Sequence, residues 1–125
     1  MDMSSVVGIR GAIICPENTK AAILASTQEL LEHIITANGI SEETVAGVFL
    51  TATRDLNADF PAYALREMGW RNTAALCAHE MEVPGAWERV IRVMIFVNRD
   101  RDKPVRHQYV GEARALRPDL ADGAE

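Results

Sequence analysis

The sequence lacks the patterns that mark secreted, membrane-spanning or disulfide-rich proteins. Cys15 and Cys77 are too few for a disulfide framework, and neither belongs to a CxxC or CxxxH pattern. No apolar stretch approaches the roughly 20 residues that span a bilayer. Residues 1–5 do not begin a secretory signal, which would need a basic patch, an apolar run and a cleavage site. We therefore expect a cytoplasmic protein with free thiols and no membrane role.

Positive charge and cofactor motifs are also scarce. The 13 Lys and Arg residues are outnumbered by 18 Asp and Glu, and they are scattered along the chain. Nucleic-acid binding needs clustered basic residues, so this class of partner is not expected. The glycines form neither a GxGxxG motif nor a Walker loop, and His33, His79 and His107 lack metal-ligand spacing. We predict no metal and no cofactor.

Hydrophobic periodicity predicts four strands and two helices in one domain over residues 1–125, with a flexible tail at about 121–125. The predicted strands span residues 6–14, 45–53, 74–78 and 90–98. A long helix follows an N-cap at Asn18 or Thr19 and ends at Asn38 before Gly39. Asp59 caps a short helix over residues 60–69, and residues 105–116 hold a strand end and a helical turn.

This order of elements predicts an α+β fold, a mixed β-sheet with its helices on one face. One long helix and one short helix cannot cover both faces of a sheet of four or five strands. The remaining apolar face is best buried against other copies of the chain, as in obligate homo-oligomers. We therefore expect an oligomer.

Two arginines interrupt strands that are otherwise apolar. In residues 90–98, alternation places Arg92 on the face opposite Ile91 and Val93, and Arg10 lies in the first strand. A guanidinium cannot lose its charge, so burying it without an acceptor is costly. Either the two arginines converge on a carboxylate ligand, or they are two unrelated surface arginines, with Arg92 in an internal ion pair or at the wet end of its strand.

Glu80 and Cys77 each allow a functional and a structural interpretation. Glu80 follows the apolar run ALCAH and is either a partner of the two arginines or a solvated strand end. Cys77 is more typical of a small buried side chain than of a nucleophile, because no His and Asp accompany it in a triad order. Trp70 and Trp87 are interpreted as packing or rim residues.

Six ordered segments resemble the AroH class of chorismate mutases over nearly the whole chain. They are GIRGA (8–12), TATRDLNADFPAYALRE (51–67), CAHEM (77–81), VIRVM (90–94), VRHQYV (105–110) and LRPDL (116–120). The resemblance implies a homotrimeric pseudo-α/β barrel with active sites between neighbouring subunits. It also implies an isomerase of aromatic amino acid biosynthesis that rearranges chorismate to prephenate without a cofactor.

The same resemblance implies the site residues. Arg92 would act at the ether oxygen of chorismate and Arg10 at a carboxylate, with Glu80 and Cys77 at the ring hydroxyl and Tyr109 at the pyruvyl carboxylate. The other residues of the cleft would be Phe60, Ala62, Arg66, Ala75, Leu76 and Leu116. Tyr63 stands where some relatives carry a lysine, so no cationic steering role is assigned there.

Two other functions fit a small trimeric fold with an interface arginine. One is an imine or enamine deaminase of the RidA type, and the other is a non-catalytic sensor of small anions. The presence of both Glu80 in CAHEM and Arg92 in VIRVM weighs against the deaminase.

Overall fold

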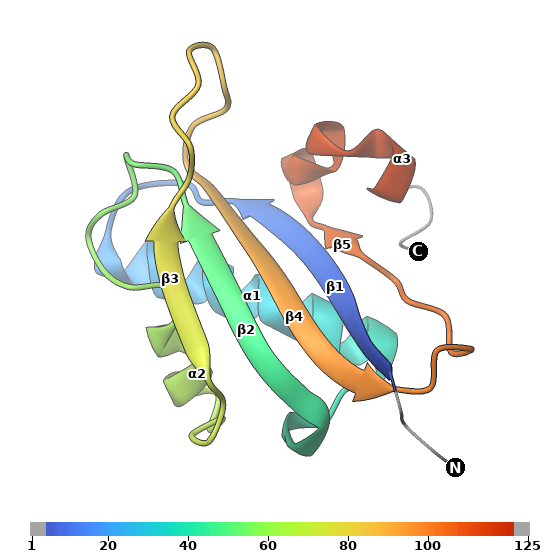
Figure 1. The fold of residues 1–125 in the computed structure, drawn as a ribbon. Coiled ribbons are helices and arrows are strands. Elements are labelled where there is room, and N and C mark those ends of the chain that lie inside the picture. The colour runs from blue at the N-terminus through green and yellow to red at the C-terminus, as the bar shows by residue number, and fades with distance from the viewer. Residues whose placement is uncertain (1–4, 122–125) are drawn as a thin grey trace.

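A computed structural model describes residues 5–121 and contains one mixed sheet of five strands (Figure 1). The sheet order is β3-β2-β4-β1-β5. The central strand β4 is antiparallel to β1 and β2, whereas β3 and β5 are parallel to their neighbours. The strands are β1 (Ser5–Ile14), β2 (Val45–Ala52), β3 (Ala75–His79), β4 (Val90–Arg99) and β5 (Gln108–Tyr109). The four predicted strands are confirmed to within one residue at each end.

The long helix α1 (Lys20–Asn38) has the ends that its sequence predicts. The side chain of Thr19 accepts a hydrogen bond from the backbone N–H of Ala22, so Thr19 rather than Asn18 is the N-cap. Gly39 adopts the left-handed conformation beyond the last turn, with φ of 61°. A 3-10 turn η1 (Glu42–Thr44) then leads into β2. No helix within residues 5–121 is long and apolar enough to cross a membrane.

The short helix α2 (Tyr63–Glu67) is shorter than predicted, and Asp59 does not cap it. The Asp59 carboxylate accepts the N–H of the next residue, Phe60, at 2.8 Å. The N–H of Tyr63 bonds to the carbonyl of Phe60, so residues 60–62 form turns before the helix begins. The prediction of a helix starting at residue 60 is therefore wrong by three residues.

The C-terminal part of the described chain is more helical than predicted. After the short strand β5 come a 3-10 segment η2 (Gly111–Leu116) and a single helical turn α3 (Pro118–Ala121). Figure 1 shows this segment beside β1 and β5, at one edge of the sheet. Apart from Ala121, the predicted flexible tail lies outside the described residues.

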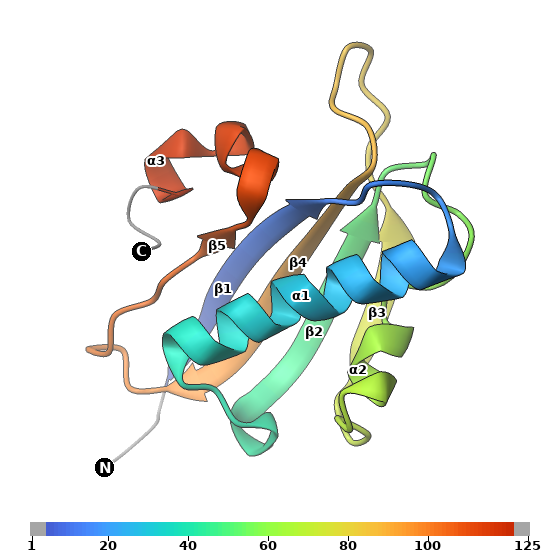
Figure 2. The ribbon, with the colours of Figure 1, turned by 180° about the vertical axis from the view of Figure 1, so that it is seen from behind.

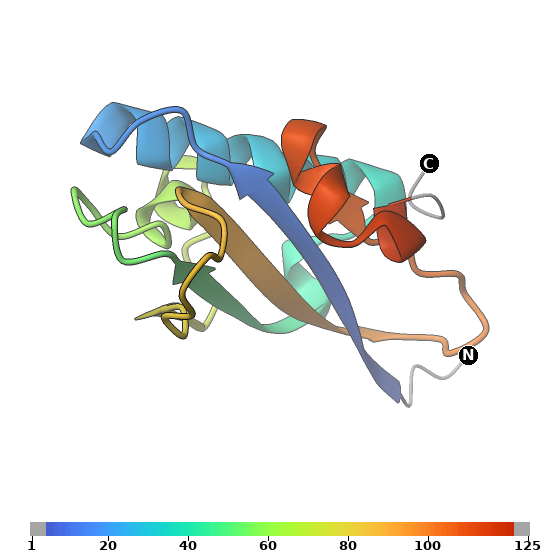
Figure 3. The same ribbon diagram turned by 90° about the horizontal axis from the view of Figure 1, so that it is seen from above.

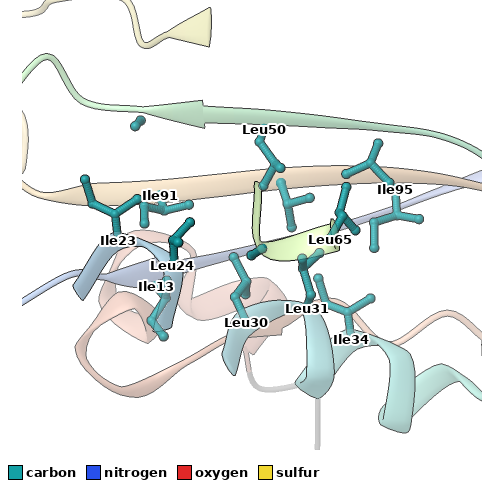
Figure 4. Close-up of a cluster of buried hydrophobic side chains, with 14 of the residues drawn as sticks. Ile13, Ile23, Leu24, Leu30, Leu31, Ile34, Leu50, Leu65, Ile91 and Ile95 are labelled. Carbon is teal, nitrogen blue, oxygen red and sulfur yellow. The ribbon is translucent and has the colours of Figure 1, made fainter. Parts of the chain in front are cut away.

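The main core lies between α1 and one face of the sheet (Figures 2 and 4). Ile23, Leu30, Leu31 and Ile34 of α1 are fully buried against that face. The sheet contributes alternate residues of its strands, which are Ile9, Ile13, Val48, Leu50, Ile91, Val93, Ile95 and Val97. Each such side chain contributes about 1.5–3 kcal/mol by leaving water. The alternation predicted for β4 is thus confirmed.

The opposite face of the sheet is largely uncovered (Figure 3). Strand alternation places Val6, Phe49, Leu76 and Phe96 there, and all four are exposed. Towards β5, a second small cluster of Ala12, Val90, Tyr109 and Ala113 packs under the C-terminal segment. The predicted α+β fold, with a mixed sheet and its main helices on one face, is confirmed.

Candidate active site

Arg92 and Glu80 meet on the uncovered face of the sheet. Arg92 Nε lies 3.1 Å from Glu80 Oε2, and the two side chains are 37% and 22% exposed. Nε has no hydrogen bond of good geometry, so the contact is an ion pair rather than an aligned bond. The Thr51 hydroxyl donates a short hydrogen bond to the same carboxylate oxygen. The internal ion pair foreseen for Arg92 is therefore present, and both groups remain accessible to a ligand.

The sheet register explains why these side chains meet. Arg92 lies opposite Thr51 on β2, and Glu80, just beyond β3, is fixed by a 2.9 Å bond from its N–H to the carbonyl of Ala52. On the other side of β4, Arg92 lies opposite Ala12 of β1, which in turn lies opposite Tyr109 of β5. The small, fully buried Ala12 separates Arg92 from Tyr109 with one methyl group.

A cavity of about 220 Å³ opens among these residues, and we call it the Arg92 pocket. Arg10, Glu80, Arg92 and Tyr109 all contribute to its wall, so four predicted site residues come together in one chain. Two guanidinium groups and a phenol beside one carboxylate suit a ligand with negative charge and a hydroxyl group. The complete wall is formed by Arg10, Gly11, Phe49, Thr51, Glu80, Arg92, Val93, Met94 and Tyr109.

His107 orients the strand segment that carries Arg10. Its Nδ1 atom accepts the backbone N–H of Arg10 at 3.1 Å, which extends the short β1–β5 ladder by one bond. Burial, followed by the positive charges of Arg10 and Arg117, lowers the pKa of His107. Because Nδ1 must be unprotonated to accept this bond, the lowered pKa and the geometry both favour the neutral imidazole.

A second group of predicted residues lines a different cavity, of about 480 Å³, which we call the Arg66 pocket. The guanidinium of Arg66 lies 5.0 Å from the centre of the Tyr63 ring, and the Phe60 ring packs edge-on against Tyr63 at 5.4 Å. Arg66, the only basic residue of α2, therefore makes a cation–π contact with Tyr63. The wall is formed by Phe60, Ala62, Tyr63, Leu65, Arg66, Trp70, Arg71, Thr73, Ala75, Leu76 and Cys77.

Cys77 belongs to the Arg66 pocket and does not lie with Glu80 within one chain. Its sulfur accepts the N–H of Ala62 at 3.3 Å. Burial raises the pKa of the Cys77 thiol, and the bond from Ala62 offsets this only in part. The thiol therefore stays protonated at neutral pH, which agrees with the interpretation that Cys77 is not a nucleophile.

The remaining predicted residue, Leu116, packs against the small cluster that contains Tyr109. Sequence reasoning missed Thr51 and His107, although both lie in segments that carried the resemblance. Alternation along residues 45–53 could have placed Thr51 on the face of Phe49, but its contact with Glu80 depends on a strand pairing that the sequence does not reveal. Within residues 5–121, no cluster of three or more His, Cys, Asp or Glu side chains is placed to hold a metal.

A model of the family "Chorismate mutase type I" matches residues 6–120. The chain belongs to this family. Chorismate mutase AroH of Thermus thermophilus is 49% identical over 117 residues, covering 92% of this chain and 96% of the relative. Chorismate mutase AroH of Bacillus subtilis (strain 168) is 43% identical over 116 residues, covering 91% of each.

A solved structure, that of chorismate mutase from Clostridium thermocellum, has the same fold as this chain. Its TM-score is 0.85 at 44% sequence identity, and the match covers 88% of this chain and 99% of that chain. The resemblance inferred from the six sequence segments is thus confirmed, both in sequence and in the arrangement of the strands.

Proposed function

We propose that the chain rearranges chorismate to prephenate, a step of aromatic amino acid biosynthesis, in a cleft shared by two copies of the chain. The isomerase activity follows from membership of the chorismate mutase family. The observation that carries the shared cleft is the division of the predicted site residues between two pockets. One copy would supply the Arg92 pocket and its neighbour the Arg66 pocket.

The uncovered face of the sheet supports assembly into a trimer. Phe49, Leu76 and Phe96 expose apolar rings and chains there in a single copy, and Leu76 is 70% exposed. Leu76 also borders the Arg66 pocket, so covering it with a neighbour would bring the two pockets together. In a closed ring of three copies joined head to tail, every copy gives one pocket and receives the other.

The reaction requires positioning and electrostatic stabilisation rather than proton transfer. In this [3,3] rearrangement the ether C–O bond breaks while a C–C bond forms within one molecule, so no group leaves and none is added. The enzyme must hold the flexible dianion in its compact diaxial, chair-like conformer and stabilise the charge that separates across the breaking bond. This demand suits a pocket with two arginines and a paired carboxylate.

We assign the roles as follows. Arg92 donates to the ether oxygen, where negative charge develops, and its ion pair with Glu80 sets its direction. Arg10 and Tyr109 bind the carboxylates, with Arg10 held by His107. Glu80 accepts the ring hydroxyl on the side that becomes electron-poor, joined by Cys77 of the neighbouring copy. Arg66 contributes positive charge at the mouth of the cleft.

A product assay tests the activity. Purified protein, without added metal or cofactor, should remove the absorbance of chorismate and yield prephenate, which acid converts to phenylpyruvate. Arg92→Ala should be nearly inactive while it remains folded. No turnover by the folded parent protein would contradict the proposal and favour the anion sensor; the family match already disfavours the imine deaminase.

Mixing two inactive variants tests the shared cleft. Arg92→Ala damages one pocket and Arg66→Ala the other. If each site takes its pockets from different copies, every mixed trimer has one intact site, so an equimolar refolded mixture should regain about a quarter of the parent activity. If both pockets of a site come from one chain, the mixture stays inactive.

The proposed cytoplasmic location is a separate prediction, which fractionation of the source cells tests.

A further inference from the structure

Arg89 has a backbone conformation that distinguishes it from every other non-glycine residue between Ser5 and Ala121. It is the only one there with positive φ, at 55°. This left-handed region is unfavourable for a residue with a side chain and persists only where the surroundings impose it. Arg89 immediately precedes β4, and Arg92 is three residues further along the chain.

The surroundings that impose this conformation come from the residues that follow two other strands. The Arg89 N–H donates to both oxygens of the Asp55 carboxylate, at 3.0 and 3.3 Å. Asp55 lies in the turn that follows β2, closed by a bond from the Leu56 N–H to the Thr53 carbonyl. On the other side, the Arg89 Nε donates to the Cys15 carbonyl at 3.0 Å, and the Cys15 N–H donates to the Arg89 carbonyl at 2.7 Å. Arg89 thus joins the ends of β1 and β2 at the start of β4.

The next residue continues this attachment towards the active site. The Val90 N–H donates to the Thr53 hydroxyl at 3.1 Å, and the Thr53 N–H donates to the Val90 carbonyl at 3.0 Å. Thr51, whose hydroxyl binds Glu80, lies two residues before Thr53. Arg92 lies two residues after Val90. The segment that binds Glu80 through the Thr51 hydroxyl is therefore anchored to the start of the strand that carries Arg92.

We propose that Asp55 and Arg89 are positioning residues for Arg92. Asp55 stabilises the left-handed conformation of Arg89, and this fixes the start of β4 and with it the direction of the Arg92 guanidinium relative to Glu80. The inference rests on the proposed function, because it assumes that Arg92 acts on the reacting bond. Neither residue lines the Arg92 pocket, so neither is expected to touch the substrate.

This role predicts a specific kinetic signature. Arg92 would act mainly in the transition state, whereas Arg10 and Tyr109 bind substrate in both states. Displacing Arg92 should therefore lower kcat with little change in KM. A misplacement of about 1 Å can cost up to a hundredfold in rate, so we expect kcat of Asp55→Ala to fall at least about tenfold, with KM within about threefold of the parent.

A double-mutant cycle shows whether Asp55 acts through Arg89. Glycine adopts the left-handed conformation without strain, so the Asp55 carboxylate should matter less when residue 89 is glycine. The factor by which Asp55→Ala lowers kcat should be at least about fivefold smaller in the Arg89→Gly background than in the parent. Asp100→Ala is the matched control. Asp100 also accepts a backbone N–H in a turn, that of Asp102 at 3.0 Å, but at the far end of β4.

The experiment measures kcat and KM for chorismate with the full chain, alongside thermal unfolding of each variant. An unchanged kcat in Asp55→Ala, a loss confined to KM, an equal loss in both backgrounds, or an equal loss in Asp100→Ala would overturn the inference. If Asp55→Ala does not fold, Asp55→Asn replaces it, since the amide oxygen keeps one acceptor, and the same comparison in both backgrounds decides. An inactive parent would instead refute the proposed function, so the two failures are distinguishable.

Discussion

Replacing Gly11 with alanine should separate β5 from β1 and disturb the Arg92 pocket. An added Cβ at this position would lie 2.3 Å from the backbone carbonyl oxygen of Gln108. It would also lie 3.0 Å from Ile34 Cδ1 and 3.1 Å from Leu30 Cδ1, so the methyl group cannot escape towards α1. Because the closest atom belongs to the backbone, the strand itself must move.

The size of the effect follows from these distances. Ordinary contact begins near 3.4 Å, so β5 would have to retreat by about 1 Å. That movement would stretch the 2.9 Å bond from the Val110 N–H to the Ala12 carbonyl beyond hydrogen-bonding distance. Overpacking and the loss of one or two hydrogen bonds together cost about 3 kcal/mol. Since Tyr109 moves with β5, kcat/KM for chorismate should fall at least about tenfold.

Gly47→Ala is the matched control, because its added Cβ would meet only the Ala74 carbonyl oxygen at 3.6 Å. Thermal unfolding followed by circular dichroism, at equal protein concentrations, should show a midpoint about 10 °C lower for Gly11→Ala and nearly unchanged for Gly47→Ala. A Gly11→Ala protein as stable and as active as the Gly47→Ala protein would refute the reasoning that Gly11 admits the close approach of β5.

Three further predictions concern single contacts. Arg92→Lys should lower kcat at least about a hundredfold in the chorismate assay, because a lysine cannot reproduce the planar guanidinium between Glu80 and the ether oxygen; activity near that of the parent would remove Arg92 from its assigned role. Thr19→Ala should lower the free energy of unfolding by about 1 kcal/mol in urea titrations, because the Ala22 N–H loses its acceptor, while Thr36→Ala in the exposed part of α1 serves as a control. The folded state lowers the pKa of His107, so the neutral form contributes stability above the unfolded pKa of about 6.5, and that contribution is lost as pH falls through the lowered folded pKa. Unfolding midpoints measured between about pH 7 and pH 5 should therefore fall more for the parent than for His107→Gln, and parallel curves would contradict this.

The sequence was sufficient to predict the elements whose ends and faces are encoded locally. Thr19 and Gly39 define the ends of α1 through capping, and strict alternation defines the buried face of β4. The helix over residues 60–69 was predicted too long, because the bond from Phe60 to the Asp59 side chain competes with the first helical turn. β5, with two residues, has no periodicity of its own and exists only because β1 pairs with it.

The sequence was sufficient to name candidate site residues but not to predict how they are arranged. Arg10 and Arg92 share a face because Ala12 lies opposite Arg92, a register that depends on long-range pairing. The resemblance implied that Cys77 accompanies Glu80 at the ring hydroxyl, and within one chain the two residues line different pockets. Side chains three residues apart along an extended strand point to opposite faces, so the two could not approach the same atom from one copy. The contacts of Thr51, Asp55 and His107 all cross between segments far apart in the sequence.

The place of β4 at the centre of the sheet has a consequence for how the chain folds during synthesis. β1 and β2 are not neighbours, and each pairs with β4, which is made after both of them. During translation, the N-terminal part of the chain therefore lacks β4, the strand with which β1 and β2 both pair, until residues 90–99 have been synthesised. A fragment that stops before Val90 would leave β1 unpaired and one edge of β2 exposed, and it would be prone to aggregate. Since Arg92 lies in β4, the pairing that joins β1 to β2 would also bring Arg10, Arg92 and Glu80 together.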